Sequence, residues 1–209
     1  MADSASPVTP RDAATVVLLR DGDDGIEVLL LCRKRAMDFA PGAHVFPGGS
    51  VDPGDADRGV DVPGDLGVPP ERVRALVGAA VRETQEECGV VLRAGDLVPW
   101  ARWITPEASH RRFDTWFFVA ATPPGEIAVA TAEADSAEWL RPAAALDAAR
   151  AGEITLLPPT AVTVAELTAF SSSAEVLAQR RAITPLMPSV VVEDGQTWLV
   201  MPEGTEYPL

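Results

Sequence analysis

Two apolar runs near the N-terminus flank a short polar segment that contains two glycines. Residues 14–19 and 26–32 are rich in Val, Ile and Leu, and residues 21–25 between them are Asp-Gly-Asp-Asp-Gly. Aliphatic runs of this length favour strands, and glycine and aspartate favour a tight reversal. The pattern predicts a β-hairpin.

Residues 71–87 change to a helical period. At 100° per residue the apolar positions fall within an arc of roughly 80°. Gly89 follows directly and is suited to end a helix. We therefore expect one amphipathic helix whose apolar stripe consists of Val73, Val77, Val81, Thr84 and Cys88.

The other segments complete a pattern of mixed strands and helices. A short strand at 44–46 runs into a Pro47-Gly48-Gly49 turn, and residues 52–70 are dense in Gly, Pro and Asp, which favours an irregular loop. Further along the chain, the pattern predicts strands at 97–104, 113–120 and 137–140 and helices at 142–151 and within 162–181. It also predicts a hairpin in which 190–193 pairs with 197–200. This mixture indicates an α/β or α+β sandwich.

Length and charge narrow the class of protein. The 209 residues suffice for one substantial core. There are 17 basic and 31 acidic residues, a net charge of -14, which repels nucleic acid and anionic membranes. No apolar run has the ~18 residues that a membrane helix needs, and no charged-then-apolar leader opens the chain. We expect a cytoplasmic protein that binds neither nucleic acid nor membrane.

The predicted helix carries acidic residues away from its apolar stripe. Glu83, Glu86 and Glu87 are spaced i, i+3 and i+4, so they share one face. An exposed face of this kind is ordinary, but two carboxylates ~5 Å apart in a partly enclosed site repel by roughly 3 kcal/mol and favour a divalent cation. The Gly48 carbonyl can add a hard oxygen donor, and this donor set suits Mg²⁺ or Mn²⁺.

These residues resemble a known motif. The nine residues 82–90, Arg-Glu-Thr-Gln-Glu-Glu-Cys-Gly-Val, are similar to the second half of the Nudix box, G-x5-E-x7-R-E-U-x-E-E-x-G-U, where U is a bulky apolar residue. Residues 49–55 resemble its first half, with Asp55 where the family has Glu. Asp55 and Arg82 are 27 positions apart where the family has 8, and Thr84 occupies an apolar position. These departures leave the role of Asp55 open.

Further segments resemble one subfamily, the motif-19-type coenzyme A diphosphatases. They are Pro-Gly-Ala-His-Val-Phe-Pro-Gly-Gly at 41–49, Trp-Ile-Thr-Pro at 103–106 and Arg-Phe-Asp-Thr at 112–115. The resemblance implies a Nudix α/β/α sandwich with a mixed β-sheet over residues 12–152, an insertion loop at 56–70, and a flexible tail at 1–11. Residues 153–209 would form a helical and hairpin extension packed on the same domain.

The resemblance also implies roles for individual residues. Glu83, Glu86, Glu87 and the Gly48 carbonyl would bind the metal, and Arg82 would brace a carboxylate. Glu83 is the first candidate for the general base, and Glu133, from a later loop, is the alternative. Arg33 and Arg112 are candidates for binding an anionic substrate.

The implied activity is metal-dependent pyrophosphohydrolysis: cleavage of the diphosphate linkage in a nucleoside diphosphate-linked compound. Coenzyme A or acyl-CoA is the favoured substrate. The alternatives are an ADP-ribose- or NADH-type dinucleotide pyrophosphatase and a catalytically weak nucleotide-binding module. For the C-terminal extension, a wall of the substrate pocket and a homodimer contact both stay open.

Overall fold

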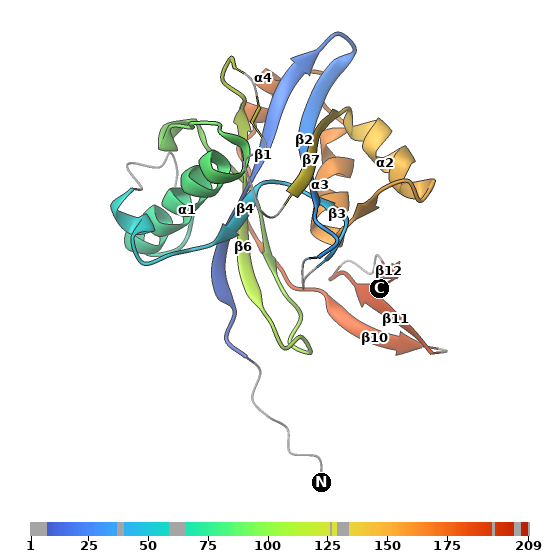
Figure 1. Cartoon of the computed structure of the whole chain (residues 1–209). Helices are drawn as coiled ribbons and strands as arrows, with labels where there is room; N and C mark the ends of the chain where they lie inside the picture. Colours follow the sequence, from blue (N-terminus) through green and yellow to red (C-terminus); the bar gives the residue numbers. More distant parts are fainter. Residues whose placement is uncertain are drawn as a thin grey trace.

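A central mixed β-sheet organises the chain in the computed structural model (Figure 1), which describes residues 8–36, 40–58, 66–125, 127–128, 134–193, 195–202 and 206–208. Within these residues the strands of the main sheet run in the order β8-β3-β2-β1-β6-β5-β9, with β4 paired to β1 and β7 to β2. Its strands are β1 (Arg11–Gly22), β2 (Gly25–Arg33), β3 (Ala43–Val45), β4 (Gly48–Ser50), β5 (Val98–Ile104), β6 (Phe113–Ala121), β7 (Ala134–Leu140), β8 (Thr155–Leu156) and β9 (Pro185–Leu186).

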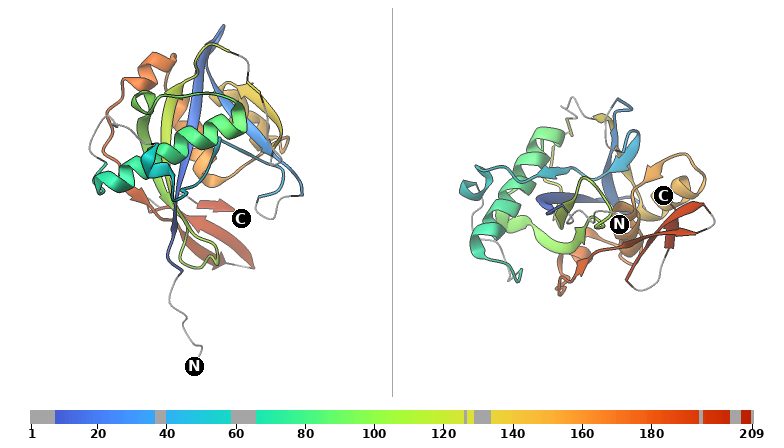
Figure 2. Two further views of the ribbon diagram at one scale, coloured as in Figure 1. Left: turned by 60° about the vertical axis from the view of Figure 1, so that its left-hand side comes forward. Right: turned by 90° about the horizontal axis from the view of Figure 1, so that it is seen from below.

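Helices cover both faces of this sheet, as Figures 1 and 2 show: α1 lies on one side, and α2 and α3 lie on the other. The helices are α1 (Pro70–Cys88), α2 (Pro142–Arg150), α3 (Pro158–Leu167) and α4 (Ser173–Leu177), with short 3-10 turns η1 (Asp55–Asp57) and η2 (Ala94–Asp96). The expected α/β/α sandwich with a mixed sheet is confirmed. None of the helices in the described residues is both long and apolar enough to cross a membrane.

Strand β1 supplies side chains to two cores because successive residues of a strand point to opposite faces. Val16 and Leu18 pack in the cluster beneath α1, whereas Val17 and Leu19 pack in the cluster beneath α2, α3 and α4. The predicted hairpin is present, since β1 and β2 pair antiparallel up to Gly22 and Gly25. The other neighbour of β1 is β6, which runs parallel to it. This central position of β1 brings β4 and its glycines against the sheet.

Helix α1 follows the predicted pattern closely. It begins at Pro70, whose fixed φ suits a first helical position, and ends at Gly89, which has a φ of 69°. The predicted stripe faces the core. Thr84 fits there because its buried hydroxyl donates to the Ala80 carbonyl at 2.8 Å. The helix therefore turns its acidic residues away from the packed core.

Two sequence predictions differ from the structure. Gly48 and Gly49 do not form a simple turn but belong to β4, which pairs antiparallel with β1, so that Thr15 lies opposite Gly48. The helical character expected at 162–181 divides into α3 and α4, and the Ser172 side chain caps α4 by accepting from the Glu175 N–H. Serines favour caps over helix interiors, which explains the division.

The C-terminal residues form a second, smaller sheet. The predicted hairpin is present as β10 (Ser189–Glu193) and β11 (Gln196–Val200), and β12 (Glu206–Pro208) pairs with β11. Val190 lies directly opposite Leu199. The domain boundaries at residues 11/12 and 152/153 and a homodimer contact of the extension stay predictions.

An ion-pair network joins α1 to the sheet away from the acidic face. The Arg102 guanidinium donates to both oxygens of the buried Asp114 at 2.8 and 2.6 Å, and Arg72 of α1 donates to Asp114 at 2.6 Å and to both oxygens of Asp12. Burial opposes ionisation of Asp114, but the hydrogen bonds and charges of Arg102 and Arg72 outweigh it and lower its pKa.

We expect Asp114→Asn to lower the melting temperature at pH 7 by roughly 6–12 °C. Removing one partner of a buried ion pair costs about 3 kcal/mol, and each kcal/mol corresponds to about 2–4 °C at this size. Because folding lowers the pKa of Asp114, its contribution is present above the unfolded value of about 3.9 and is lost as the pH falls through the folded value. The difference between variant and wild type should therefore shrink below about pH 4.

Thermal unfolding followed by circular dichroism between pH 3 and 7 measures this difference. A melting-temperature gap that stays constant over that range would contradict the role given to the Asp114 carboxylate.

Candidate metal and substrate site

The Arg82 guanidinium is the centre of the acidic face of α1. It donates to both oxygens of Asp55 at 2.9 Å, to Glu83 at 2.7 Å, to Glu86 at 3.2 Å and to the Ser50 carbonyl at 3.0 Å. The Arg82 side chain is 10% exposed and that of Asp55 is 1% exposed. The hydrogen bonds to Asp55 and then to Glu83 raise the pKa of Arg82 above its ordinary value, so this group stays charged. Arg82 thus forms ion pairs with Asp55 and Glu83, and its role as a brace for a metal-binding carboxylate stays a prediction.

Asp55 reaches Arg82 although 27 positions separate them in the sequence. The η1 turn that carries Asp55 packs directly on α1 at Gly78, where a Cβ atom would overlap the Asp55 carbonyl oxygen. Burial of Asp55 opposes its ionisation, and the hydrogen bonds and charge of Arg82 outweigh that effect, so its pKa lies below the ordinary value. The role of Asp55, which the sequence left open, is to hold Arg82 in place.

The two glycines of β4 lie against two of the predicted metal ligands. A Cβ at Gly49 would overlap the Glu83 carboxylate, and one at Gly48 would overlap the Ala14 carbonyl oxygen. The Gly48 N–H donates to Glu87 Oε2 at 2.9 Å. At Gly48 a side chain would prevent the close pairing of β4 with β1, and at Gly49 a side chain would displace the Glu83 carboxylate. The contact made by Gly48 to the acidic face is through its N–H, and metal binding by its carbonyl stays a prediction.

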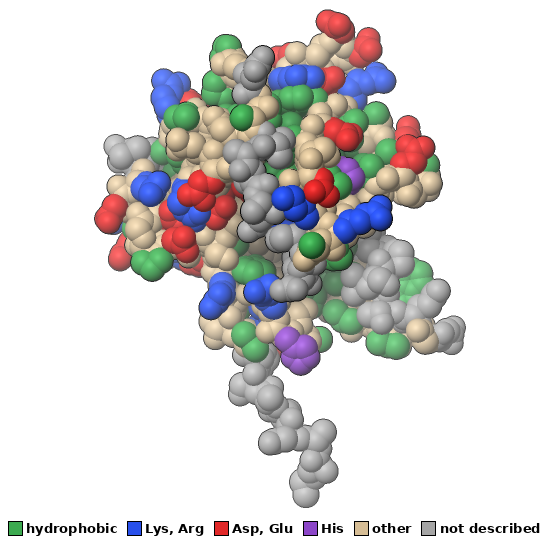
Figure 3. Space-filling view, in the orientation of Figure 1, with side chains coloured by type: hydrophobic (Ala, Val, Ile, Leu, Met, Phe, Trp, Pro, Cys, Tyr) green, Lys and Arg blue, Asp and Glu red, His purple; other side chains and the backbone are tan. Residues whose placement is uncertain are grey.

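The three glutamates differ in exposure. Glu83 is largely enclosed, with a side chain 16% exposed, Glu87 is half-buried, and the Glu86 side chain is 58% exposed. Burial raises the pKa of Glu83, although hydrogen bonding and charge from Arg82 oppose this. Figure 3 shows acidic and arginine side chains intermixed over α1.

The donor set fits a hard divalent cation. Asp52 adds a further carboxylate, with an oxygen 3.8 Å from Arg82, so the negative charge around this guanidinium exceeds its single positive charge. Among the described residues no three acidic, histidine or cysteine side chains already converge on one point. Glu83 and Glu86 instead turn toward Arg82, and the uncompensated charge, all on oxygen ligands, is what Mg²⁺ or Mn²⁺ would neutralise.

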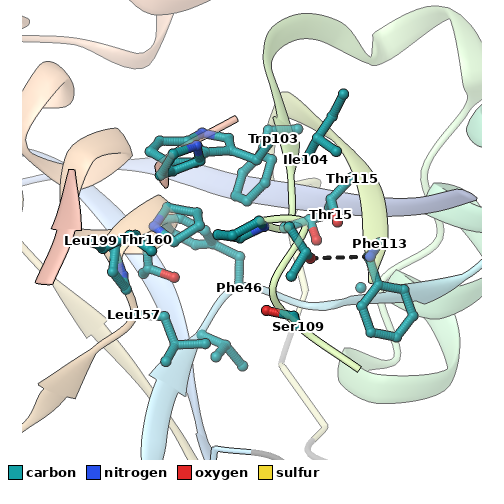
Figure 4. A pocket seen from close by; sticks show the side chains of 18 of the residues that line it. Thr15, Phe46, Trp103, Ile104, Ser109, Phe113, Thr115, Leu157, Thr160 and Leu199 are labelled. Atoms are coloured by element: carbon teal, nitrogen blue, oxygen red, sulfur yellow. Dashed lines mark hydrogen bonds between the residues drawn. The ribbon is translucent and has the colours of Figure 1, made fainter. Parts of the chain in front are cut away.

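An apolar cavity of about 390 Å³ opens beside this acidic face. Its lining includes Gly48 and Glu87, and most of its other walls are apolar. Figure 4 shows Leu157, Thr160 and Leu199 on one side of the cavity and Thr15, Ser109 and Phe113 on the other. The apolar and aromatic lining residues are Val45, Phe46, Trp103, Ile104, Pro106, Phe113, Phe117, Leu157, Pro158, Pro159, Pro188, Val190 and Leu199.

The remaining predicted site residues lie in different places. Arg33 lines the cavity. Arg112 is buried elsewhere: its guanidinium donates to the Thr105 and Val8 carbonyls at 3.0 and 2.8 Å, and it is not a lining residue. Glu133 lies outside the described residues. The structure therefore brings Arg33, but not Arg112, to the cavity next to the glutamates.

The sequence left open whether the C-terminal extension forms a wall of the substrate pocket, and it did not indicate which residues of the extension line this cavity. Leu157, Val190 and Leu199 come from residues more than 60 positions after the glutamates, and all three line it. The sequence indicated only that Val190 and Leu199 belong to a hairpin, in which paired residues of the two strands point to the same side. Which side faces the domain is decided by tertiary packing.

Part of the chain matches a known domain family. Residues 63–159 match the NUDIX domain family. A curated relative, nudix hydrolase 7 of Caenorhabditis elegans, is 29% identical over 197 residues, which cover 77% of this chain and 60% of the relative. The chain thus spans less than two thirds of that relative's length.

Solved structures share the same fold. A NUDIX hydrolase from Alicyclobacillus acidocaldarius has a TM-score of 0.74 and 28% identity, with 84% of this chain and 98% of that chain covered. The NUDIX domain of Shewanella oneidensis NrtR, solved with ADP ribose, has a TM-score of 0.53 and 15% identity over 78% of this chain and 88% of that one. At that identity the second likeness concerns the fold alone.

Proposed function

We propose that this chain is a Nudix hydrolase that hydrolyses the diphosphate linkage of coenzyme A or an acyl-CoA with the help of Mg²⁺ or Mn²⁺. The observation that carries the proposal is a shared boundary: Glu87 of the acidic face of α1 lines the apolar cavity, together with Gly48 of β4, whose N–H donates to Glu87. A substrate with a charged diphosphate next to an uncharged chain matches such a boundary.

The acidic face would hold the metal through Glu83, Glu86, Glu87 and the Gly48 carbonyl. A bound divalent ion would neutralise charge on the diphosphate and make a bound water easier to deprotonate. Arg82 keeps the Glu83 carboxylate in position through its 2.7 Å hydrogen bond, and Asp55 in turn fixes Arg82. The Glu83 carboxylate is thus held in place before a metal binds, which limits the reorganisation that this ligand needs during the reaction.

Glu83 is the proposed general base. Its carboxylate is largely enclosed and held between Gly49 and Arg82, so it is oriented before substrate binds. A base must lie within hydrogen-bonding reach of the proton that it removes, and a carboxylate held in place beside the proposed metal ligands would meet that requirement. Glu133 stays the alternative base, because family members differ over which acid takes the proton.

The composition of the cavity lining favours coenzyme A over substrates that have polar groups on both sides of the diphosphate. Coenzyme A joins a charged nucleotide to an uncharged pantetheine chain, whereas ADP-ribose and NADH carry polar sugars on both sides of the diphosphate. Within the described lining, Arg33 is the one cationic side chain, and the walls around it are mainly apolar. Binding sites that take uncharged chains have this composition, with few polar groups to fix orientation.

A substrate panel tests the proposal. Coenzyme A, octanoyl-CoA, ADP-ribose and NADH are incubated with Mg²⁺, with Mn²⁺ or with EDTA, and products are separated by chromatography. We expect metal-dependent release of 3',5'-ADP from both coenzyme A compounds, and complete loss of turnover in EDTA. AMP as the dominant product, from ADP-ribose or together with NMNH from NADH, would assign the enzyme to ADP-ribose- or NADH-type substrates instead. Tight nucleotide binding without a metal-dependent product would indicate a binding module.

A further inference from the structure

The C-terminal hairpin contributes an apolar wall to the cavity. A diphosphate is charged, so this wall suits another part of the ligand. Val190 of β10 and Leu199 of β11 are directly opposite each other in the ladder, and both line the cavity. Leu157, at the start of α3, lines it as well. Leu199 is only 7% exposed, so the hairpin is seated against the domain here and does not project freely.

The apolar wall and the acidic face border the same cavity, so one ligand can contact both. Gly48 and Glu87 line the same cavity, which at about 390 Å³ has the size of a site for a small organic ligand. A ligand whose diphosphate lies at Glu87 would therefore extend its uncharged end toward aliphatic side chains. Apolar surface buried between such groups is stabilising without any directional contact.

From this placement we propose that Val190 and Leu199 form a subsite for the acyl chain of an acyl-CoA, and that they set the chain length that the enzyme accepts. The inference rests on the proposed function, and it adds the residues that determine specificity. Each methylene buried contributes about 0.8 kcal/mol, which corresponds to about fourfold in affinity. Up to the length that fills the cavity, kcat/KM should rise by as much as about fourfold per methylene.

Val190→Trp tests the proposal by filling the subsite. We expect the ratio of kcat/KM for octanoyl-CoA over coenzyme A to fall at least tenfold. Val192→Trp is the matched control: Val192 stands on the same strand, is 67% exposed and is not a lining residue, so the ratio should stay at the wild-type value. Leu199→Ala enlarges the cavity, so the acyl chain with the highest kcat/KM should be longer than in the wild type.

Isothermal titration in EDTA separates this inference from the proposed activity, because binding is then measured without turnover. We expect octanoyl-CoA to bind more tightly than coenzyme A to wild type and to the Val192→Trp variant, and equally to the Val190→Trp variant. If wild type hydrolyses neither compound but retains this binding pattern, the activity is wrong and the subsite stands. Equal losses for both ligands in the Val190→Trp variant, or no dependence on chain length in wild type, would overturn the subsite.

Discussion

Glu86→Gln is expected to lower kcat by at least about 100-fold while the fold and the melting temperature stay close to those of the wild type. The side chain of Glu86 is 58% exposed, and its contact with Arg82 is a 3.2 Å surface ion pair, so the change removes little that stabilises the fold. It does remove a carboxylate from the set proposed to hold the metal. A 100-fold loss corresponds to about 2.7 kcal/mol of transition-state stabilisation, within the range that a metal ion supplies.

The control for this variant is Glu71→Gln. Glu71 lies in the first turn of the same helix and is exposed, so the substitution makes the same chemical change away from the site. Both variants are compared by steady-state kinetics over a range of Mg²⁺ concentrations and by circular dichroism. Near-normal turnover of Glu86→Gln at saturating Mg²⁺ would show that the acidic face of α1 is an ordinary surface.

Arg82→Met has the largest expected effect on stability. The Asp55 carboxylate, 1% exposed, would lose both hydrogen bonds from the guanidinium and remain buried, with the Asp52 N–H and the charge of Arg58 still stabilising it. Such a loss costs about 3–5 kcal/mol, or roughly 6–20 °C in melting temperature for a chain of this size. Turnover should disappear as well, because Glu83 loses its brace.

An exposed ion pair provides the comparison for Arg82. Arg93 donates to Asp96 at 2.8 Å in a similar two-bond arrangement, but its side chain is 86% exposed. Arg93→Met should leave both the melting temperature and the turnover unchanged. Equal melting temperatures for the two variants, measured by differential scanning calorimetry, would contradict a structural role for the buried pair.

The sequence was sufficient to predict the elements whose signal is local. Helix α1 could be predicted because its apolar positions recur every three or four residues and Gly89 marks its end. The β1–β2 hairpin could be predicted from two aliphatic runs on either side of Gly22 and Gly25. Within α1, the grouping of three glutamates on one face follows from spacing alone. None of these features depends on distant parts of the chain.

Contacts between distant segments were not predictable in the same way. Nothing near Asp55 indicates that η1 folds back on Gly78 and Arg82, because this contact depends on how the turn packs after a long intervening segment. Gly48 and Gly49 read as a turn, since a glycine pair gives no local sign that β4 will pair with β1. The cavity wall at Val190 and Leu199 likewise depends on the seating of the hairpin.

The contact between η1 and α1 also affects how much free energy it costs to change the number of residues between them. The segment between the two elements is fastened at both ends, by the Asp55–Arg82 contact on one side and by the start of α1 at Pro70 on the other. The entropy lost in closing such a stretch grows only with the logarithm of its length, by about 0.6 kcal/mol for each doubling. Lengthening or shortening this connection should therefore cost little free energy as long as the contact between the Asp55 carboxylate and the Arg82 guanidinium is kept.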